Sequence, residues 1–408
     1  MNVWLISLFD PTPIDDPIYP RFIEIAKSAY EKGHSVTHFT STFRHTIKKH
    51  RFDNDHVHIQ NEKYQVVFTK SLGYKSNFNP RRFYAHLDYA KRLLKEFDKH
   101  SRPDVIFLSM PPISIAYEVT AWANKRNIPV VVDIIDPWPD SFIKDVPKRV
   151  KPLFKLLIKP FYNRVKAAFS RSSAITAISN GYLEWAASFH ETNKITKPFY
   201  LSIDLEDIQK EQALMQKQFA SEKGKQLRLI YAGSLASSYD IPTILGAAEK
   251  LDQTHKDKIK FVITGSGPQK ELIYEAQKKC SNIEYLGFVS KEELIKQYYL
   301  ADLGLIQHKN NLTQTITYKF FNYMSCGMPL LNSLQSEMAK LIQDNHLGMN
   351  NMPGDVDALV NNILQYYNNP DLYQRHSKNA LEFTRNYGDV KMVYGRLVEF
   401  LEEISKSK

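Results

Sequence analysis

The sequence predicts an α/β protein made of two doubly wound domains, each with a parallel sheet between layers of helices. Three observations lead to this fold class. The 408 residues are too many for one compact core and suit two domains. Short apolar, β-branched runs alternate with longer helical patterns, which is typical of parallel sheets. Finally, this alternation starts again near residue 227, after a polar stretch.

The first half of the chain contains five runs that we expect to form strands. Two helical patterns lie between them, at 19–34 and 81–100, and Gly33 is a plausible stop for the first. The alternation predicts a parallel sheet with helices on both faces. The expected strands are residues 3–9, 35–41, 104–109, 128–134 and 174–179.

The second half repeats the pattern, and the tail at 386–408 is helical. We therefore predict a first domain at 1–200, which the C-terminal helix rejoins, and a second domain at 201–385, with a connector near 198–226. Two such sheets facing a central cleft would bind ligands at the carboxyl ends of their strands. The expected strands are residues 227–234, 259–267, 283–288, 303–308 and 328–333.

Charge and composition limit the class of partner. The net charge of +10 indicates an anionic partner, either a phosphorylated ligand, a membrane face or nucleic acid, but no nucleic-acid recognition motif is present. The only cysteines, Cys280 and Cys326, form neither a disulfide framework nor a zinc pattern, which fits a reducing cytoplasm. The first residues lack a basic n-region, and we expect a buried strand there rather than a signal peptide. No run of 18 apolar residues occurs.

Five ordered motifs carry a family resemblance. Four lie in the second half, "YAGSLASSYDIPTILGAAEKL", "FVITGSGPQKELI", "NIEYLGFVSKEELIKQYYLADLGLI" and "YKFFNYMSCGMPLLNS", and the first half adds "VVVDIIDPWPDSF". Together they resemble family-4 retaining glycosyltransferases of bacterial surface-polysaccharide synthesis. The resemblance implies the GT-B fold, with two Rossmann-like domains. It also implies sugar transfer from a nucleoside-diphosphate (NDP) sugar, expected to be UDP-linked, without a metal ion or other cofactor.

The resemblance implies a donor site at the strand ends of the second domain. Glycines after a strand let a backbone approach a phosphate, although any tight turn also uses them. Many relatives place an arginine and a lysine where this chain has Ser234 and Tyr239, so that pair of charges is missing. Phe288 and Val289 would neighbour the base, or would simply be core. The expected donor residues of these loops are Gly233, Ser234, Gly265, Ser266, Gly267, Phe288 and Val289.

A helix near residue 318 is expected to complete the donor site. Relatives often have two glutamates eight residues apart; here those positions are Gln314 and Asn322. An amide at 322 could still hold ribose, but Gln314 cannot carry negative charge beside a developing oxocarbenium ion. Lys319 is the best candidate to balance the negative charge of the leaving diphosphate. The other interpretation is that Lys319 is simply a solvent-exposed lysine on the surface of a helix. Tyr318 is expected to line the same site.

The acceptor side is expected in the first domain. Asp136 follows a strand and could contact a sugar hydroxyl or take the acceptor proton, or it could cap a turn. Asp133 is expected to support it, and Trp138 could stack on a sugar or simply pack. Other acceptor candidates are Tyr19, Arg21, Arg81 and Arg82. The resemblance implies attack on the face from which the diphosphate leaves, with retention of configuration.

A basic amphipathic stretch lies at 144–171. Its apolar residues follow i, i+3, i+4 spacing, Lys151, Lys155 and Lys159 form a neighbouring stripe, and Pro160 should kink or split the helix. Such a helix, near 148–166, could dock on anionic lipid, or it could be a domain helix with its lysines in water. The resemblance implies a lipid-diphosphate-linked acceptor. Together with the basic helix, this leads us to expect a cytoplasmic protein, peripheral at the inner face of the cytoplasmic membrane.

Three other functions stay open at this stage. The amides at 314 and 322 favour a nucleotide-sugar-binding subunit without activity of its own. An epimerase on the same fold would convert the donor without an acceptor. A metal-dependent transferase would use an Asp-x-Asp triplet, but those at Asp53–Asp55 and Asp355–Asp357 fit turn or cap positions better.

Overall fold

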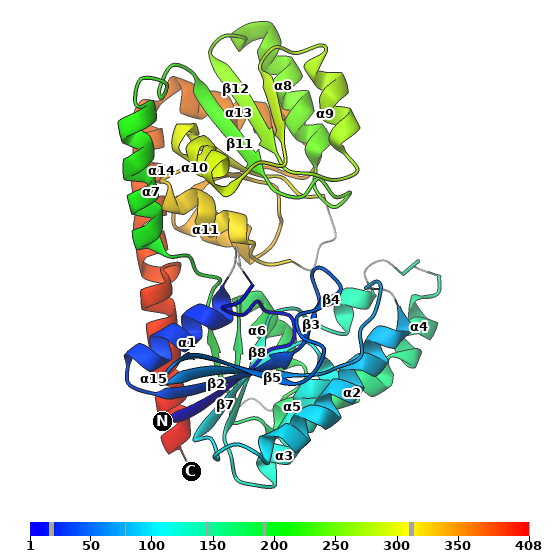
Figure 1. Ribbon diagram of the computed structural model, residues 1–408. Helices are drawn as coiled ribbons and strands as arrows, with labels where there is room; N and C mark the ends of the chain where they lie inside the picture. The colour runs from blue at the N-terminus through cyan, green and yellow to red at the C-terminus, as the bar shows by residue number, and fades with distance from the viewer. Residues whose placement is uncertain are drawn as a thin grey trace. The chain divides into compact units, whose positions relative to one another are not determined.

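The computed structural model describes residues 1–15, 20–77, 79–143, 146–147, 149–190, 193–309 and 314–407. The chain forms two compact units (Figure 1). Unit 1 comprises Met1–Tyr200 and Val390–Lys408, and unit 2 comprises Leu201–Asp389. The C-terminal helix is therefore part of unit 1, in which it packs against α1. Among the described residues, no helix combines the length and the apolar character needed to cross a lipid bilayer.

Unit 1 is built on an eight-stranded sheet in the order β10-β9-β8-β7-β1-β2-β6-β5. All neighbours pair in parallel except β5, which runs antiparallel to β6 at the edge. The strands are β1 (Asn2–Ile6), β2 (Ser35–Ser41), β5 (His56–Asn61), β6 (Tyr64–Thr69), β7 (Val105–Met110), β8 (Val130–Ile134), β9 (Ala174–Ala177) and β10 (Ile195–Pro198), and a separate hairpin has β3 (Phe43–Arg44) and β4 (Lys49–His50).

Helices cover both faces of the unit 1 sheet (Figure 1). Alternation along β1 divides its side chains between them. Trp4 lies against Phe97 and Trp122 of α2 and α3, with ring centroids 4.7 and 5.9 Å away, whereas Val3 and Leu5 share a core with α1 and α15. The helices are α1 (Arg21–Glu31), α2 (Pro80–Phe97), α3 (Ile113–Asn124), α4 (Lys151–Leu157), α5 (Lys159–Arg171), α6 (Asn180–Ala187), α15 (Val390–Lys406) and the 3-10 turn η1 (Asp140–Phe142).

Unit 2 has a six-stranded, fully parallel sheet in the order β13-β12-β11-β14-β15-β16. Its main core lies between the sheet and α8, α9 and α13. The strands are β11 (Leu227–Ala232), β12 (Ile259–Thr264), β13 (Ile283–Gly287), β14 (Leu303–Ile306), β15 (Leu330–Asn332) and β16 (Gly348–Asn350). The helices are α7 (Leu205–Phe219), α8 (Ile241–His255), α9 (Lys270–Gln277), α10 (Lys291–Leu300), α11 (Tyr318–Ser325), α12 (Glu337–Asp344), α13 (Val356–Asn368) and α14 (Pro370–Tyr387).

All ten expected strands are present, most of them shorter than their apolar runs. The predicted connector at 198–226 is wrong over much of its length, because 205–219 forms helix α7, whose first turn is capped by the side chain of Asp204. Strands β3, β4, β5, β6, β10 and β16 were not predicted. The side chains of β5 are almost all exposed, so this edge strand shows none of the apolar alternation that identifies a strand.

Candidate functional site

Three glycines shape the strand ends of unit 2. Gly233, Gly265 and Gly267 have φ values of +143°, +134° and +153°, which L side chains rarely adopt. A Cβ on Gly265 would lie 1.7 Å from the carbonyl oxygen of Gly233, and one on Gly267 would lie 2.7 Å from the carbonyl carbon of Leu235. These two glycines therefore let the β11 and β12 loops pack backbone against backbone.

Gly233 makes room for a side chain. A Cβ at this position would lie 2.7 Å from Cε and 2.9 Å from Nζ of Lys319. The sequence suggested that this glycine lets a phosphate approach the backbone. The lysine of α11 occupies the space that a side chain at 233 would need, so the two predicted donor residues lie next to each other.

Backbone hydrogen bonds hold the loops together. Gly233 N donates to Thr264 O at 2.9 Å, and Gly265 N donates to Gly287 O at 2.7 Å. The ends of β11, β12 and β13 are thus fixed side by side. Ser234 and Ser266, both predicted donor residues, are at least partly exposed on the surface that these loops form.

Lys319 projects from the first turn of α11 against two aromatic rings. Its Nζ lies 4.6 Å from the ring centroid of Tyr231 and 4.1 Å from that of Tyr239, and 3.5 Å from the Tyr231 hydroxyl. Among the described residues it has no carboxylate partner. Burial lowers the pKa of Lys319 to about 7, because nothing anionic compensates for the lost water.

The start of α11 leaves a second polar group unsatisfied. Thr317 occupies the N-cap position, but its side chain does not cap the helix, and its buried Oγ1 has no hydrogen-bond partner in the described part of the chain. A helix N-terminus carries a partial positive charge, which makes a cation in the first turn unfavourable. A lysine without a carboxylate partner, a hydroxyl without a hydrogen-bond partner and this helix end, all among the described residues, are suited to binding an anion.

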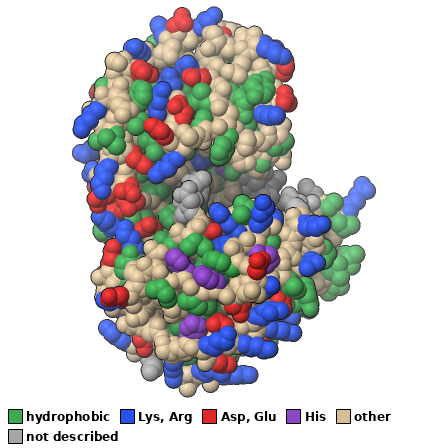
Figure 2. Space-filling view, viewed as in Figure 1, with side chains coloured by type: hydrophobic (Ala, Val, Ile, Leu, Met, Phe, Trp, Pro, Cys, Tyr) green, Lys and Arg blue, Asp and Glu red, His purple; other side chains and the backbone are tan. Residues whose placement is uncertain are grey.

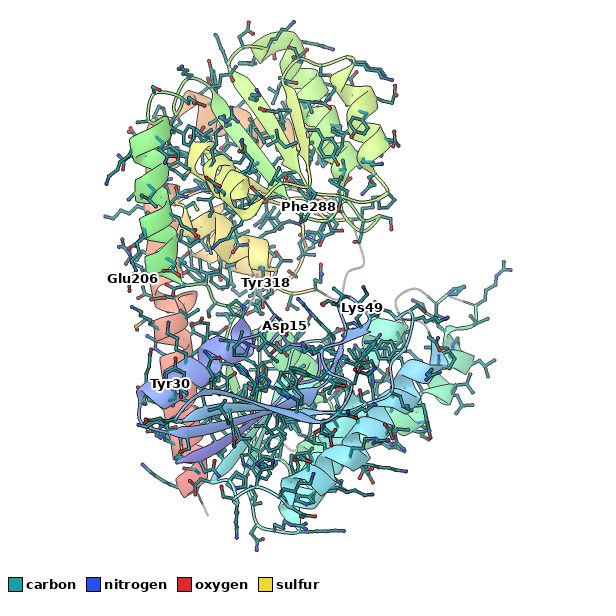
Figure 3. The ribbon with its side chains drawn as sticks, viewed as in Figure 1. Asp15, Tyr30, Lys49, Glu206, Phe288 and Tyr318 are labelled. Carbon is teal, nitrogen blue, oxygen red and sulfur yellow. The ribbon has the colours of Figure 1, made fainter. Side chains whose placement is uncertain are left out.

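The other predicted donor residues differ in how far their side chains are exposed. Phe288 is 82% exposed, directly after β13, and Figure 3 shows it at the same edge of unit 2 as Tyr318. Val289, Tyr318 and Asn322 are half-buried, and Gln314 is exposed. The large exposed ring of Phe288 excludes the interpretation that it is a core residue.

In unit 1, Asp136 holds a turn together. Its carboxylate accepts hydrogen bonds from the indole Nε1 of Trp138, at 2.9 Å, and from the Ser141 hydroxyl. Trp138 is only 5% exposed and packs on Phe142, with ring centroids 4.6 Å apart. Its ring therefore packs, and the sugar-stacking hypothesis for Trp138 is not consistent with its burial.

The predicted acceptor arginines differ in exposure. Arg82 is 7% exposed, and its guanidinium lies 4.7 Å from the Trp138 ring centroid, so it is not presented to a ligand as the sequence suggested. Arg81, its neighbour at the start of α2, is exposed. Tyr19 lies outside the described residues.

Arg21 forms a buried ion pair. Its Nη2 donates to Asp133 Oδ2 at 2.8 Å, and its Nη1 donates to Phe199 O at 3.3 Å. The second carboxylate oxygen of Asp133 accepts from Thr176 Oγ1 at 2.7 Å. Arg21 and Asp133 are 4% and 0% exposed, so this pair joins α1 to β8 and β9 and does not present an acceptor contact.

The sequence analysis missed Asp10. This carboxyl lies beyond β1, near Arg21 and Asp133, and its Oδ2 is buried without a partner among the described residues. Burial raises the pKa of Asp10 to about 7, although the Arg21 charge opposes this shift. The available signal was an aspartate directly after the apolar run at 3–9.

The Asp-x-Asp triplets have other uses. Asp55 Oδ1 accepts from Lys70 N at 2.6 Å, and Asp355 caps α13 through a 2.9 Å bond from Ala358 N. Asp357 pairs with Lys250. These roles agree with the turn and cap interpretation.

The basic stretch is split into α4 and α5, as expected, but the break lies at Ile158, and Pro160 is the second residue of α5. Every described side chain of α4 is at least partly exposed, and Leu153, Leu156 and Leu157 are 61–66% exposed. The apolar stripe becomes buried only from Ile158 onward. Figure 2 shows hydrophobic side chains exposed beside Lys and Arg in the part of unit 1 that carries α4.

Comparison with known families matches both units. Residues 214–383 match the model of "Glycosyl transferases group 1", and residues 21–197 match that of "Glycosyltransferase Family 4". Among curated proteins, UDP-glycosyltransferase TURAN of Arabidopsis thaliana is 27% identical over 129 residues. That match spans 27% of this chain and 28% of the relative.

Solved structures share the fold over the whole chain. Sucrose-phosphate synthase from Thermosynechococcus elongatus has a TM-score of 0.73 at 13% identity, covering 100% of both chains. Anabaena HepE in complex with UDP-glucose has a TM-score of 0.65 at 13% identity, covering 99% of this chain and 100% of HepE. WaaG, a glycosyltransferase involved in lipopolysaccharide biosynthesis, has a TM-score of 0.63 at 14% identity, covering 98% and 99%.

Proposed function

Because the chain belongs to the family-4 glycosyltransferases and has their GT-B fold, we propose that it transfers a sugar from an NDP-sugar to a saccharide or lipid-linked acceptor. The observation that carries this proposal is the anion site at the start of α11. There Lys319, which has no carboxylate partner among the described residues, lies beside Gly233 at the end of β11. Two residues before it, the N-cap hydroxyl of Thr317 has no hydrogen-bond partner in the same described part of the chain. A diphosphate provides the negative charge that this arrangement lacks.

In the proposed reaction, the bond between the sugar C1 and the diphosphate oxygen breaks, and its electron pair leaves with the nucleotide. The acceptor hydroxyl oxygen bonds to C1 and gives up its proton to the leaving phosphate. Lys319 and the start of α11 stabilise the negative charge that develops on the diphosphate. Attack on the face of departure retains the anomeric configuration, and no metal ion is required.

We propose UDP as the nucleotide and a hexose or N-acetylhexosamine as the sugar. The HepE structures with UDP and UDP-glucose support the choice of UDP. The exposed ring of Phe288 is a suitable neighbour for the base, and Asn322 for ribose. The involvement of WaaG in lipopolysaccharide biosynthesis supports an acceptor from capsule, O-antigen or exopolysaccharide synthesis. Exposed Arg81 is the remaining arginine candidate for an acceptor diphosphate.

A donor panel tests this function. We expect the purified protein to hydrolyse or transfer one UDP-sugar among UDP-, GDP-, ADP- and dTDP-sugars, with lipid-diphosphate saccharides as acceptors and product masses as the readout. Activity should survive EDTA. Conversion of a donor into its epimer without acceptor would contradict transfer.

A second candidate is a donor-binding subunit that supports a partner enzyme. The replacement of both expected acids by Gln314 and Asn322 favours it, since Gln314 carries no negative charge to place beside a developing oxocarbenium ion. In the same panel, tight donor binding without turnover would favour this candidate. Turnover by the isolated chain would exclude it.

We further propose that α4 docks the protein on the inner face of the cytoplasmic membrane. Its exposed leucines beside Lys151, Lys155 and Lys159 suit an anionic lipid surface. Each lysine near such a surface contributes about 1 kcal/mol, so changing all three to glutamate should weaken binding to phosphatidylglycerol vesicles at least ~100-fold. Sedimentation with vesicles measures this.

The control for membrane binding carries the same charge change elsewhere on unit 1. Lys63, Lys91 and Lys125 are exposed and lie outside α4. Their replacement by glutamate should leave most of the binding intact. Equal losses from both triple variants would show that net charge, and not α4, determines the association.

A further inference from the structure

We propose that donor binding draws a proton onto Lys319, so that the protein takes up one proton for each donor diphosphate it binds. This inference rests on the proposed function, because it requires a diphosphate at the start of α11. It adds a property that the family resemblance does not supply: above pH 7, the lysine that neutralises the donor is mostly uncharged while the site is empty.

The surroundings of Lys319 disfavour its charge in the empty site. Two phenol rings and the backbone at Gly233 replace water around Nζ. Its one hydrogen bond within the described part of the chain, to Tyr231, is long at 3.5 Å. Lys319 also stands in the first turn of α11, where the helix dipole repels a cation. The two cation–π contacts stabilise the charged form by about 0.5–2 kcal/mol each. This is less than the free energy needed to bury an isolated charge.

The titratable groups that face Lys319 cannot supply a counter-charge. Tyr231 and Tyr239 have pKa values raised by burial, so both are neutral near pH 7. The Tyr323 hydroxyl accepts a hydrogen bond from Ala232 N at 2.9 Å, and His308 lies beyond Tyr239, with ring centroids 4.7 Å apart. The positions where relatives carry glutamates hold uncharged Gln314 and Asn322. The donor is therefore the source of negative charge at this site.

The proton balance follows from these charges. The pKa of Lys319 in the empty site is about 7, so most of the amine is neutral at pH 8. A bound diphosphate raises this pKa by direct attraction, and the amine then gains a proton. Donor affinity should therefore fall about tenfold per pH unit above pH 7, for as long as the bound form stays protonated. A lysine with an ordinary pKa would give no such slope.

Titration calorimetry at pH 8, in buffers of different ionisation enthalpy, tests the inference with UDP-glucose and the other sugars of the panel. An NDP-sugar has no terminal phosphate that ionises near pH 6, so protons taken up on binding are bound by the protein and not by the donor. We expect close to one proton per donor bound. Lys319→Arg, which stays charged, should bind with uptake near zero and with an affinity that is flat from pH 7 to 9.

The outcomes separate the inference from the proposed function. Donor binding without proton uptake, or equal uptake by wild type and Lys319→Arg, would overturn the inference while the donor site stands. Failure of every donor to bind would overturn both.

Thermal unfolding without ligand tests the low pKa of Lys319 independently of donor binding, so the test still works if a variant binds the donor poorly for other reasons. The folded state holds fewer protons on Lys319 than the unfolded state between pH 7 and 10.5, so this group makes wild type less stable as pH falls through that window. Lys319→Met should therefore raise the Tm relative to wild type more at pH 7 than at pH 10. An identical Tm difference at both pH values would overturn the inference.

Discussion

Replacing Lys319 with alanine should lower turnover at least tenfold, equivalent to about 1.4 kcal/mol of activation free energy. The reason is that the two positive charges of many relatives are absent at Ser234 and Tyr239, which leaves Lys319 as the cation at the ends of β11 and β12. Its charge should matter more as negative charge moves onto the leaving diphosphate, so kcat should fall more than donor affinity. Initial rates at saturating donor and acceptor measure this.

Two controls separate this effect from misfolding. Lys319→Ala removes a partly buried cation without a counter-ion, so the Tm near pH 7 should not fall. Lys340→Ala removes an exposed lysine of α12 that pairs with Asp344, and it should leave turnover unchanged. Near-normal turnover of Lys319→Ala would refute the role of this lysine in balancing the diphosphate.

The order of strands and helices along the chain was predictable, because parallel strands that are buried on both faces produce continuous apolar runs in the sequence. The runs that became β7 and β8 are fully buried, and the sequence located both within two residues. The exposed edge strand β5 lacks this signal. The stretch that became α7 is polar on most of its surface, which made a helix resemble a linker.

The site was predictable only as far as local motifs extend. Lys319 and the three glycines stood out in the sequence, but the contact between Lys319 and Tyr231 joins residues 88 positions apart. Neither the aromatic rings nor the unsatisfied Thr317 hydroxyl could be inferred from spacing. Their arrangement adds a second reason for a glycine at 233, because a side chain there would collide with Lys319.

For Arg21, the sequence suggested a binding role that the structure does not support. The suggestion came only from its position in the chain, close to a loop that was expected to bind the ligand. The helix that begins at Arg21 packs on the sheet of unit 1, and the arginine points into that interface. A single residue in a loop-to-helix boundary gives no sign of whether its side chain faces inward. Here the inward direction of the Arg21 side chain is determined by the buried carboxylate of Asp133 on β8, which also accepts a hydrogen bond from Thr176 on β9.

Replacing Arg21 with alanine should destabilise the protein by about 3–5 kcal/mol, because it leaves the Asp133 carboxylate buried without its cation. The nearby carboxyl of Asp10, which already has a raised pKa, would lose the same compensating charge. Urea unfolding followed by circular dichroism measures the loss. Arg21→Ala combined with Asp133→Asn removes both charges and should recover at least half of it. If Arg21→Ala instead kept full stability and lost acceptor affinity, Arg21 would have to contact the acceptor, and the ion pair would not be its main role.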